Sequence, residues 1–258
     1  MTGIVNLPLV PLRESDSERS EMTSQLLFGE CVEILETREH WLLLRNHSDN
    51  YVGWADKKMI RILKKQEEQQ LSVSKSYCVS YPLMKGEDRA TGETLILPGG
   101  SKLIGFDGIE MKVDDKRFQF DPVHLTAIDK KNSNHLIELA KQYLNAPYLW
   151  GGKTIMGIDC SGLVQVIFSI CGIQLPRDAS QQVEYGKVID FLSEVKAGDL
   201  AFFENTEGKI IHVGILLNSH QIIHASGWVK IETIDSQGII SGQTGEYSHN
   251  LRVVKRLL

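Results

Sequence analysis

Apolar residues recur along the chain with two different periods. Between residues 1 and 62, short apolar runs at 26–35, 41–45 and 51–54 alternate with charged or polar turns. Runs of this length and spacing predict a small all-β barrel. The polar stretch 64–70 that follows predicts either a linker or a solvated helical turn.

Residues 72–125 predict a second, diverged copy of this barrel. The segment LPGG at 97–100 corresponds to LFGE at 27–30, and FQF at 118–120 corresponds to YVGW at 51–54. A short turn and an apolar residue follow each aromatic pair. Because this second copy differs strongly from the first, we expect it to have no role beyond packing.

The third region changes from helical to strand periodicity. Residues 136–143 predict a helix that stops before Pro147, and the apolar run 163–171 predicts a helix buried on all sides. Strand-like runs follow at three places, 199–204, 210–217 and 221–225. Helices followed by antiparallel strands predict an α+β fold.

Composition narrows the function classes. The 258 residues are 42% hydrophobic and 24% charged, with a net charge of −5. No basic surface is therefore expected for nucleic acid, and no apolar run is long enough to span a bilayer. The first residues lack the basic segment and the cleavage site of a signal peptide, so we expect the protein to be located in the cytoplasm. A signal peptide that had been removed would leave the same sequence.

The four cysteines are scattered and show no C-x-x-C spacing, which disfavours a structural zinc site or a disulfide framework. Cys160 differs from the others because it would open the buried helix. Asp159 is the expected N-cap, and Gly172 is the expected C-terminal stop. The positive end of the helix dipole would lower the pKa of a thiol there, so Cys160 is a candidate nucleophile.

A thiol nucleophile needs a base, and histidine suits that role near neutral pH. His212 and His224 lie within strands made otherwise of Ile, Val and Leu, joined by the short connector 218–221. A hairpin of this kind can bring both rings to one face, so that one pairs with Cys160 and the other orients it. The remaining histidines are predicted to be solvated: His40, His47, His124, His135, His220 and His249.

With these residues in place, residues 135–250 resemble the NlpC-type family of papain-like cysteine peptidases, which cleave bacterial cell-wall peptides. The matching segments are YLWGG at 148–152, DCSG at 159–162, GDL at 198–200, HVGI at 212–215 and HAS at 224–226. The resemblance implies that Cys160 is the nucleophile, His212 the general base and acid, and His224 the polar third member. It further implies that the Tyr148 hydroxyl helps to stabilise the oxyanion, alongside the backbone N–H of Cys160.

The N-terminal regions extend the resemblance, because GE…W…YxGW is similar to bacterial SH3-type domains. The whole then resembles γ-D-glutamyl-L-diamino acid endopeptidases of the dipeptidyl-peptidase VI kind. The implied domains are two small all-β SH3-type barrels, 1–62 and 63–128, and a peptidase domain, 129–258.

That group acts on peptidoglycan stem peptides, L-Ala-γ-D-Glu-(L-Lys or diaminopimelate), with a free L-Ala amine, and uses no cofactor or metal. A Glu and a Tyr of the first SH3-type domain hold the amine. The best matches are Glu21 and Tyr51, with Glu30 competing for the Glu role. Four residues match positions of the substrate pocket: Trp150, Asp159, Ser161 and Asp178. Asp159 has a second explanation as a helix cap, and Asp178 as a solvated loop acid.

Other functions remain as alternatives. A papain-like amidase or acyltransferase would keep the nucleophile and change the bond, and an inactive protein would only bind wall peptide. A metallohydrolase is disfavoured because the sequence has no H-E-x-x-H arrangement. Either diamino acid is compatible with the sequence, as are wall turnover and recycling of imported fragments, and any oligomeric state.

Overall fold

Strands dominate the structure, a computed structural model that describes residues 1–127 and 135–258. These residues cluster into two compact units. The first contains the described residues up to 127 together with 153–155 and 169–174, and the second contains the others. The expected boundary between the second and third domains, at 128/129, lies outside the described residues.

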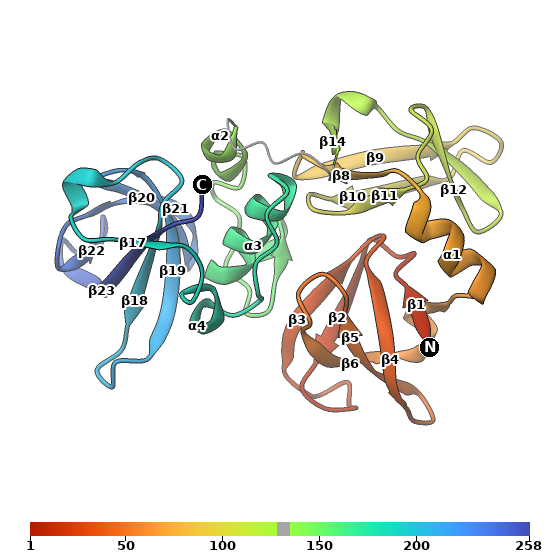
Figure 1. Ribbon diagram of the computed structural model, residues 1–258, viewed down its shortest axis with the longest axis horizontal. Helices are drawn as coiled ribbons and strands as arrows, with labels where there is room; N and C mark the ends of the chain where they lie inside the picture. The colour runs from red at the N-terminus through yellow and green to blue at the C-terminus, as the bar shows by residue number, and fades with distance from the viewer. Residues whose placement is uncertain (128–134) are drawn as a thin grey trace. The chain divides into compact units, whose positions relative to one another are not determined.

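The N-terminal barrel is one antiparallel sheet in the order β3-β2-β6-β5-β4-β1-β7 (Figure 1). Its side chains alternate between core and surface, so that Leu42 and Leu44 of β5 are buried whereas Trp41 and Leu43 are half-buried. The strands are β1 (Thr2–Ile4), β2 (Leu9–Arg13), β3 (Met22–Leu27), β4 (Cys31–Thr37), β5 (Trp41–Asn46), β6 (Val52–Asp56) and β7 (Arg61–Ile62).

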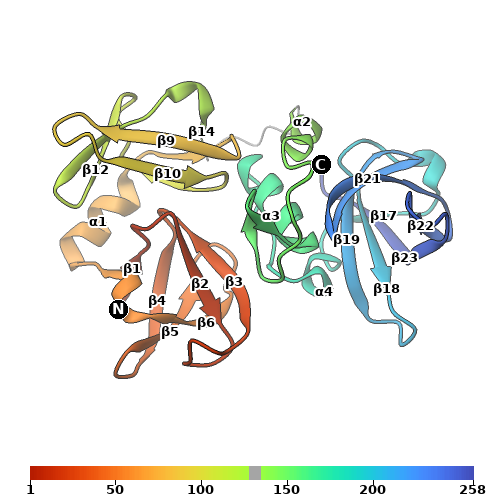
Figure 2. The ribbon, with the colours of Figure 1, turned by 180° about the vertical axis from the view of Figure 1, so that it is seen from behind.

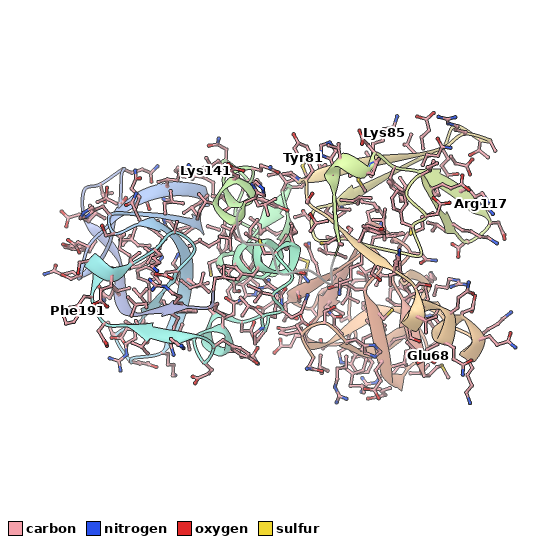
Figure 3. The ribbon with its side chains drawn as sticks, turned by 45° about the horizontal axis from the view of Figure 1, so that its top comes forward. Glu68, Tyr81, Lys85, Arg117, Lys141 and Phe191 are labelled. Carbon is pink, nitrogen blue, oxygen red and sulfur yellow. The ribbon has the colours of Figure 1, made fainter. Side chains whose placement is uncertain are left out.

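The second barrel is built from two sheets, β10-β9-β13-β12 and β11-β8-β14, around one apolar core. Charged side chains such as Lys85 and Arg117 project outward from it (Figure 3). Its strands are β8 (Ser76–Val79), β9 (Leu83–Asp88), β10 (Thr94–Pro98), β11 (Lys102–Ile104), β12 (Glu110–Val113), β13 (Lys116–Gln119) and β14 (Leu125–Ala127).

The two barrels share local details that support the predicted repeat. After its last aromatic strand, each makes a 3₁₀ turn, η1 (Lys57–Met59) in the first and η2 (Pro122–His124) in the second. An aspartate caps each turn: Asp56 accepts a hydrogen bond from the next-but-one backbone N–H at 2.8 Å, and Asp121 does so at 3.0 Å.

The polar stretch after the first barrel forms a helix, α1 (Lys65–Val73), so the helical interpretation was the correct one of the two. None of its residues is buried. Its first turn is fixed by Glu67, whose carboxylate accepts a hydrogen bond from the Lys64 N–H at 2.8 Å. The α1 helix is therefore held by capping and by surface charge rather than by a buried apolar face.

The second unit combines helices with a strongly curved sheet, which confirms the α+β fold expected for the third region. Helices α2 (Leu136–Lys141) and α3 (Cys160–Ile170) lie on one side of this sheet (Figures 1 and 2). A short helix α4 (Ala179–Gln182) and a turn η3 (Leu192–Glu194) precede the main strands. Two short strands, β15 (Lys153–Thr154) and β16 (Gly157–Ile158), lie in the segment before α3.

The main sheet has the order β17-β23-β18-β19-β20-β21-β22, and β22 also pairs with β23. The strands from β18 to β23 therefore close into a barrel, with β17 added at β23. The expected hairpin is confirmed, since β19 and β20 pair directly. The strands are β17 (Lys187–Ile189), β18 (Leu200–Glu204), β19 (Ile210–Asn218), β20 (Gln221–Ser226), β21 (Trp228–Ile234), β22 (Gly238–Ile240) and β23 (Tyr247–Arg256).

Helix α3 is buried on all sides, as its apolar sequence predicts. Leu163, Val164, Ile167 and Phe168 are fully inaccessible to solvent. Gly172 lies two residues after the end of the helix, and its φ of 79° is the left-handed conformation expected of a C-terminal stop. Among the described residues, no helix is both long enough and apolar enough to cross a bilayer.

Candidate active site

Cys160 is the first residue of helix α3, and Asp159 caps that helix. The Asp159 Oδ1 accepts a hydrogen bond from the Gly162 N–H at 2.7 Å, and the Asp159 carbonyl accepts one from Leu163 at 2.9 Å. The expected N-cap is therefore confirmed. Gly162 is required because a Cβ there would lie 2.3 Å from the carbonyl oxygen of Gly152.

The Asp159 carboxylate is also the centre of a buried ion pair with Arg177. The Arg177 Nη1 donates to Asp159 Oδ1 at 3.0 Å and to Ser161 Oγ at 2.8 Å, and its Nη2 donates to Asp159 Oδ2. The Gly151 N–H donates to Oδ2 at 2.8 Å. These bonds occupy the carboxylate, so a contact from Asp159 to substrate would have to come from its backbone.

Arg177 was not among the sequence candidates. It lies in a polar segment that looks solvated, yet only 1% of its surface is exposed. The sequence signal that could have identified Arg177 is weak, because it is a single arginine in the segment PRDA at 176–179.

His212 and His224 lie side by side on the hairpin, as predicted. The His212 Nε2 and the His224 Nδ1 are 2.9 Å apart, and the rings meet edge to face. Both are buried, with 5% of His212 and 0% of His224 exposed. Gly214 makes this approach possible, because a Cβ at that position would lie 2.9 Å from the Cβ of His224.

A glutamate missed by the sequence analysis lies on the other side of His224. The His224 Nε2 and the Glu232 Oε2 are 2.9 Å apart. The second carboxylate oxygen, Oε1, accepts a hydrogen bond from the Gly242 N–H at 2.9 Å and lies 3.3 Å from the Lys230 Nζ. A chain of polar contacts thus runs from His212 through His224 to Glu232.

His249 was predicted to be solvated, and this prediction was wrong. It is half-buried in β23, and its ring stacks on His212 with centroids 4.1 Å apart and planes 26° apart. Burial and the neighbouring His224 lower the pKa of His249 to about 4. At neutral pH it therefore presents a neutral, flat surface to the His212 ring. The polar sequence around it gave no sign of a strand that folds back onto β18 and β22.

The Cys160 thiol lies next to the strand that carries His212. It receives hydrogen bonds from the backbone N–H groups of Val213 and Ser161, and Val213 directly follows His212. Because the His212 Nε2 faces His224, the Nδ1 is the ring nitrogen left for the thiol. The structure thus assembles Cys160, His212 and His224 in one place.

The prediction that the helix dipole lowers the pKa of the Cys160 thiol was wrong. Burial, followed by the Asp159 carboxylate, raises the pKa of Cys160 to about 11 and outweighs the two backbone N–H groups. Burial and the neighbouring His249, His224 and Lys230 hold the pKa of His212 well below 6.5. Both shifts favour a neutral thiol beside a neutral imidazole at rest.

Tyr148 is brought to the same site. Burial, and next the neighbouring Cys160, raise the pKa of Tyr148 to about 12, so its hydroxyl keeps the proton that an oxyanion donor needs. A bridge between Tyr148 and Ile158 holds the tyrosine against the strand that leads into Asp159. The hydroxyl and the N–H of Cys160 are therefore the groups here that could stabilise negative charge.

The other expected pocket residues of this unit lie around α3. Ser161 is buried and held by Arg177, Trp150 is 58% exposed, and Asp178 is half-buried at the N-terminus of α4. Trp150 and Asp178 are thus accessible to solvent, and the Ser161 hydroxyl accepts a hydrogen bond from Arg177.

Glu21 and Glu30, the two alternatives in the first unit, differ in environment. Glu21 is exposed just before β3. Glu30 is 4% exposed; its carboxylate accepts a hydrogen bond from the Leu27 N–H at 2.9 Å and lies 3.7 Å from the Lys153 Nζ of the same unit. Burial raises the pKa of Glu30, but the charges of Lys153 and Lys102 and this hydrogen bond lower it overall. Glu30 is therefore a structural carboxylate.

Three imidazoles could in principle hold a metal ion: within the described residues, His212, His224 and His249 place ring nitrogens within 4.8 Å of one another. Two features oppose this. His212 and His224 already share a hydrogen bond, and the rings of His212 and His249 stack nearly in parallel, so their lone pairs do not converge. An ion bound there would break the hydrogen bond between His212 and His224.

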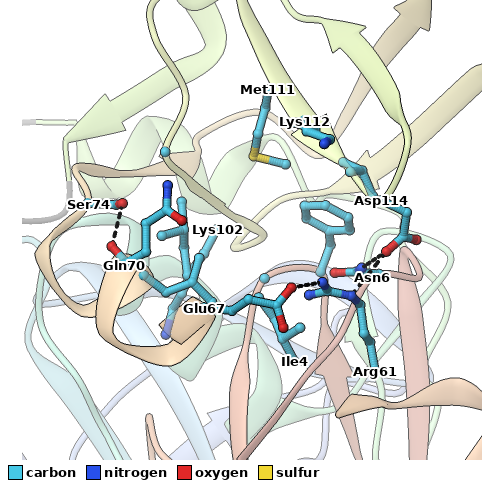
Figure 4. Close-up of a pocket in the computed structure, with 16 residues that line it drawn as sticks. Ile4, Asn6, Arg61, Glu67, Gln70, Ser74, Lys102, Met111, Lys112 and Asp114 are labelled. Carbon is cyan, nitrogen blue, oxygen red and sulfur yellow. Dashed lines mark hydrogen bonds and ion pairs between the residues drawn. The ribbon is translucent and has the colours of Figure 1, made fainter. Parts of the chain in front are cut away.

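A pocket of about 320 Å³ lies elsewhere, in the first unit (Figure 4). Its main charges are paired: Arg61 contacts Glu67 and Asp114, and the Asn6 amide donates to Asp114 at 3.0 Å. Of the described residues that line it, none is a cysteine or a histidine. This pocket is therefore not the chemical centre.

The comparison with known proteins agrees with this site. Residues 145–246 match the NlpC/P60 family, and residues 12–60 match the bacterial dipeptidyl-peptidase SH3 domain. A γ-D-glutamyl-L-lysine dipeptidyl-peptidase of Bacillus subtilis (strain 168) is 31% identical over 214 residues, which are 78% of this chain and 71% of the relative. The chain therefore belongs to the NlpC/P60 family of cysteine peptidases.

A second relative with the same name, from Bacillus cereus (strain ATCC 10987), is 25% identical over 260 residues, covering 88% of this chain and 74% of the relative. The crystal structure of an NlpC/P60 family protein from Bacillus cereus ATCC 10987 has a TM-score of 0.85, with 19% identity over all of both chains. At this identity the structural likeness concerns the fold.

Replacing Cys160 by Ala should abolish peptidase turnover and leave the fold intact, because the substitution removes one sulfur atom. Loss of the nucleophile in a serine protease triad costs on the order of 10⁶-fold in kcat, and a similar loss is expected here. The matched control is Cys31→Ala, a cysteine outside the site, which should keep its activity. Turnover of a wall peptide by Cys160→Ala above a few per cent of wild type would disprove the assignment.

The pH dependence of kcat/KM should follow the neutral thiol–imidazole pair. As the pH falls through the pKa of His212, which lies below 6.5, the imidazole gains a proton and can no longer accept the one on Cys160. We expect a plateau from pH 6.5 into the alkaline range, towards the thiol pKa of about 11. Circular dichroism at each pH separates this loss from unfolding. An acid limb centred above pH 6.5 would contradict the expectation.

Proposed function

We propose that this protein hydrolyses the γ-D-Glu–L-diamino acid bond of peptidoglycan stem peptides whose N-terminal L-Ala amine is free. The observation that supports it most is the 2.9 Å contact between the buried His212 and His224 beside Cys160. It occurs in a chain whose relatives are named γ-D-glutamyl-L-lysine dipeptidyl-peptidases. Such a reaction would serve recycling or turnover of the wall.

In the proposed reaction, the Cys160 sulfur attacks the carbonyl carbon of the γ-amide while His212 takes the thiol proton. Tyr148 and the N–H of Cys160 donate hydrogen bonds to the oxyanion. His212 then gives its proton to the departing amine, and a water molecule hydrolyses the thioester with His212 as the base. No step requires a cofactor.

Product analysis tests the bond. Incubation of L-Ala-γ-D-Glu-L-Lys in ¹⁸O-water should release free L-Lys and place one ¹⁸O atom in the γ-carboxyl group of L-Ala-D-Glu. The diaminopimelate peptide, run in parallel, ranks the two diamino acids. Transfer of the acyl group to an added amine would instead identify an acyltransferase, and cleavage of the lactoyl–L-Ala bond of a muramoyl peptide would identify an amidase.

The free amine is the finer part of the proposal. Glu21 and Tyr51 of the first barrel would bind an ammonium group by charge-assisted hydrogen bonds. The Glu30 carboxylate is buried and contacts Leu27 and Lys153, which argues against Glu30 for this role. Glu21 lies at the surface of the barrel. Tyr51 packs its ring partly against the barrel core, which would hold its hydroxyl in place.

Acetylation of the substrate amine should therefore lower kcat/KM. The lost charge pair is worth about 2–5 kcal/mol, or about 30- to 5,000-fold. The measurement compares L-Ala-γ-D-Glu-L-Lys with its N-acetyl form in wild type, in Glu21→Gln and in the matched surface control Glu39→Gln. Selectivity should collapse only in Glu21→Gln. Equal rates on both peptides with wild type would refute a closed amine site, and full selectivity in Glu21→Gln would exclude Glu21.

A further inference from the structure

His224 is held between two partners that differ in what they can do with a proton. Its Nδ1 lies 2.9 Å from the His212 Nε2, and its Nε2 lies 2.9 Å from the Glu232 Oε2. None of the His224 surface and 8% of the Glu232 surface is exposed, so water does not compete freely for these contacts. Each contact therefore needs one donor and one acceptor from the residues themselves.

Glu232 can act only as an acceptor. Its Oε1 receives the Gly242 N–H at 2.9 Å and lies 3.3 Å from the Lys230 ammonium, while Oε2 faces His224. Burial alone would raise the pKa of Glu232, but the contacts with His224, Gly242 and Lys230 outweigh it and lower the pKa to about 2. The group is a carboxylate throughout the working pH range, and a carboxylate has no proton to donate.

The protons of both imidazoles follow from this. Since Glu232 accepts, the His224 Nε2 must carry a proton, and a ring with a single proton there has a lone pair on Nδ1 that can accept a hydrogen bond. The His212 Nε2 must therefore donate to it. Neutral His212 carries a single ring proton, so its Nδ1 is left free of one.

We propose that Glu232 is a positioning residue that sets the tautomers of His224 and His212 in series, so that the proton-free Nδ1 of His212 accepts the Cys160 proton. This role rests on the proposed peptidase mechanism. When the sulfur–carbon bond forms, the thiol proton moves to the His212 Nδ1, and the resulting imidazolium keeps its Nε2 proton on His224. The negative charge of Glu232 stabilises that cation through the intervening ring, until the proton passes to the departing amine.

The substitution Glu232→Gln tests the series directly. The Oε1 position faces two donors, Gly242 N–H and Lys230, so the amide oxygen must occupy it and the NH₂ group must face His224. That NH₂ group donates to the His224 Nε2, which moves the His224 proton to Nδ1 and the His212 proton from Nε2 to Nδ1. The base then has no lone pair for the thiol.

We expect kcat to fall about 10⁴-fold, the loss known for the equivalent acid-to-amide change in a serine protease triad, with little change in KM. Glu232→Asp keeps an acceptor-only group and should restore a substantial part of the activity. The matched control is Glu246→Gln, an exposed acid in the segment between β22 and β23. Thermal melting verifies that each variant is folded.

The decisive readout is ¹⁵N NMR of the histidine rings, which reports tautomers without any substrate. Wild type should carry its protons on the Nε2 of both His212 and His224, and Glu232→Gln should carry them on Nδ1. A wild-type spectrum with a proton on the His212 Nδ1 would overturn the proposal, as would unchanged tautomers or undiminished kcat in Glu232→Gln. Because the spectra need no turnover, they test Glu232 even if the proposed substrate is wrong.

Discussion

The buried ion pair between Asp159 and Arg177 is the interaction on which the rest of the catalytic unit depends. One carboxylate caps α3, receives the N–H of Gly151 and binds the guanidinium in two places. It thereby ties the glycine-rich approach, the nucleophile helix and the segment before α4 together. Removal of the guanidinium would leave the Asp159 carboxylate buried without its counter-charge, which costs about 3–5 kcal/mol. The position of Cys160 is thus set by electrostatics as much as by apolar packing.

The same carboxylate has an electrostatic consequence for the nucleophile. Asp159 stands beside Cys160, and together with burial it keeps the thiol protonated, while burial keeps His212 neutral. The helix dipole alone would have favoured a thiolate. In the proposed reaction the thiol would keep its proton until a substrate carbonyl arrives, and the charge that then develops would be stabilised by Tyr148 and by the polar chain behind His212.

The two N-terminal barrels share backbone features although their sequences differ. Each closes its last strand with an aspartate-capped turn, at Asp56 and at Asp121. Gly29 and Gly100 both have positive φ, at 77° and 89°, and their N–H groups donate to Val5 and Val79. The structure therefore pairs Gly29 with Gly100, one residue away from the correspondence of 27–30 with 97–100 expected from the sequence. The apolar core of the second barrel contains aromatic side chains, including Phe106 and Phe118, where the core of the first barrel is mainly aliphatic. The backbone turns thus agree between the two barrels, whereas the side chains of their cores differ.

The sequence by itself determined the features that depend on local patterns. Apolar periodicity gave the buried helix, its cap and the hairpin, and residue spacing with the family resemblance gave Cys160, His212 and His224. Only the tertiary structure brought in Arg177, Glu232 and His249, which come from a polar segment, a strand edge and the last strand. It also reversed the expected pKa of Cys160. Burial and the distance between charges decide such properties, and both arise from chain segments that are remote in sequence but adjacent once the barrel closes.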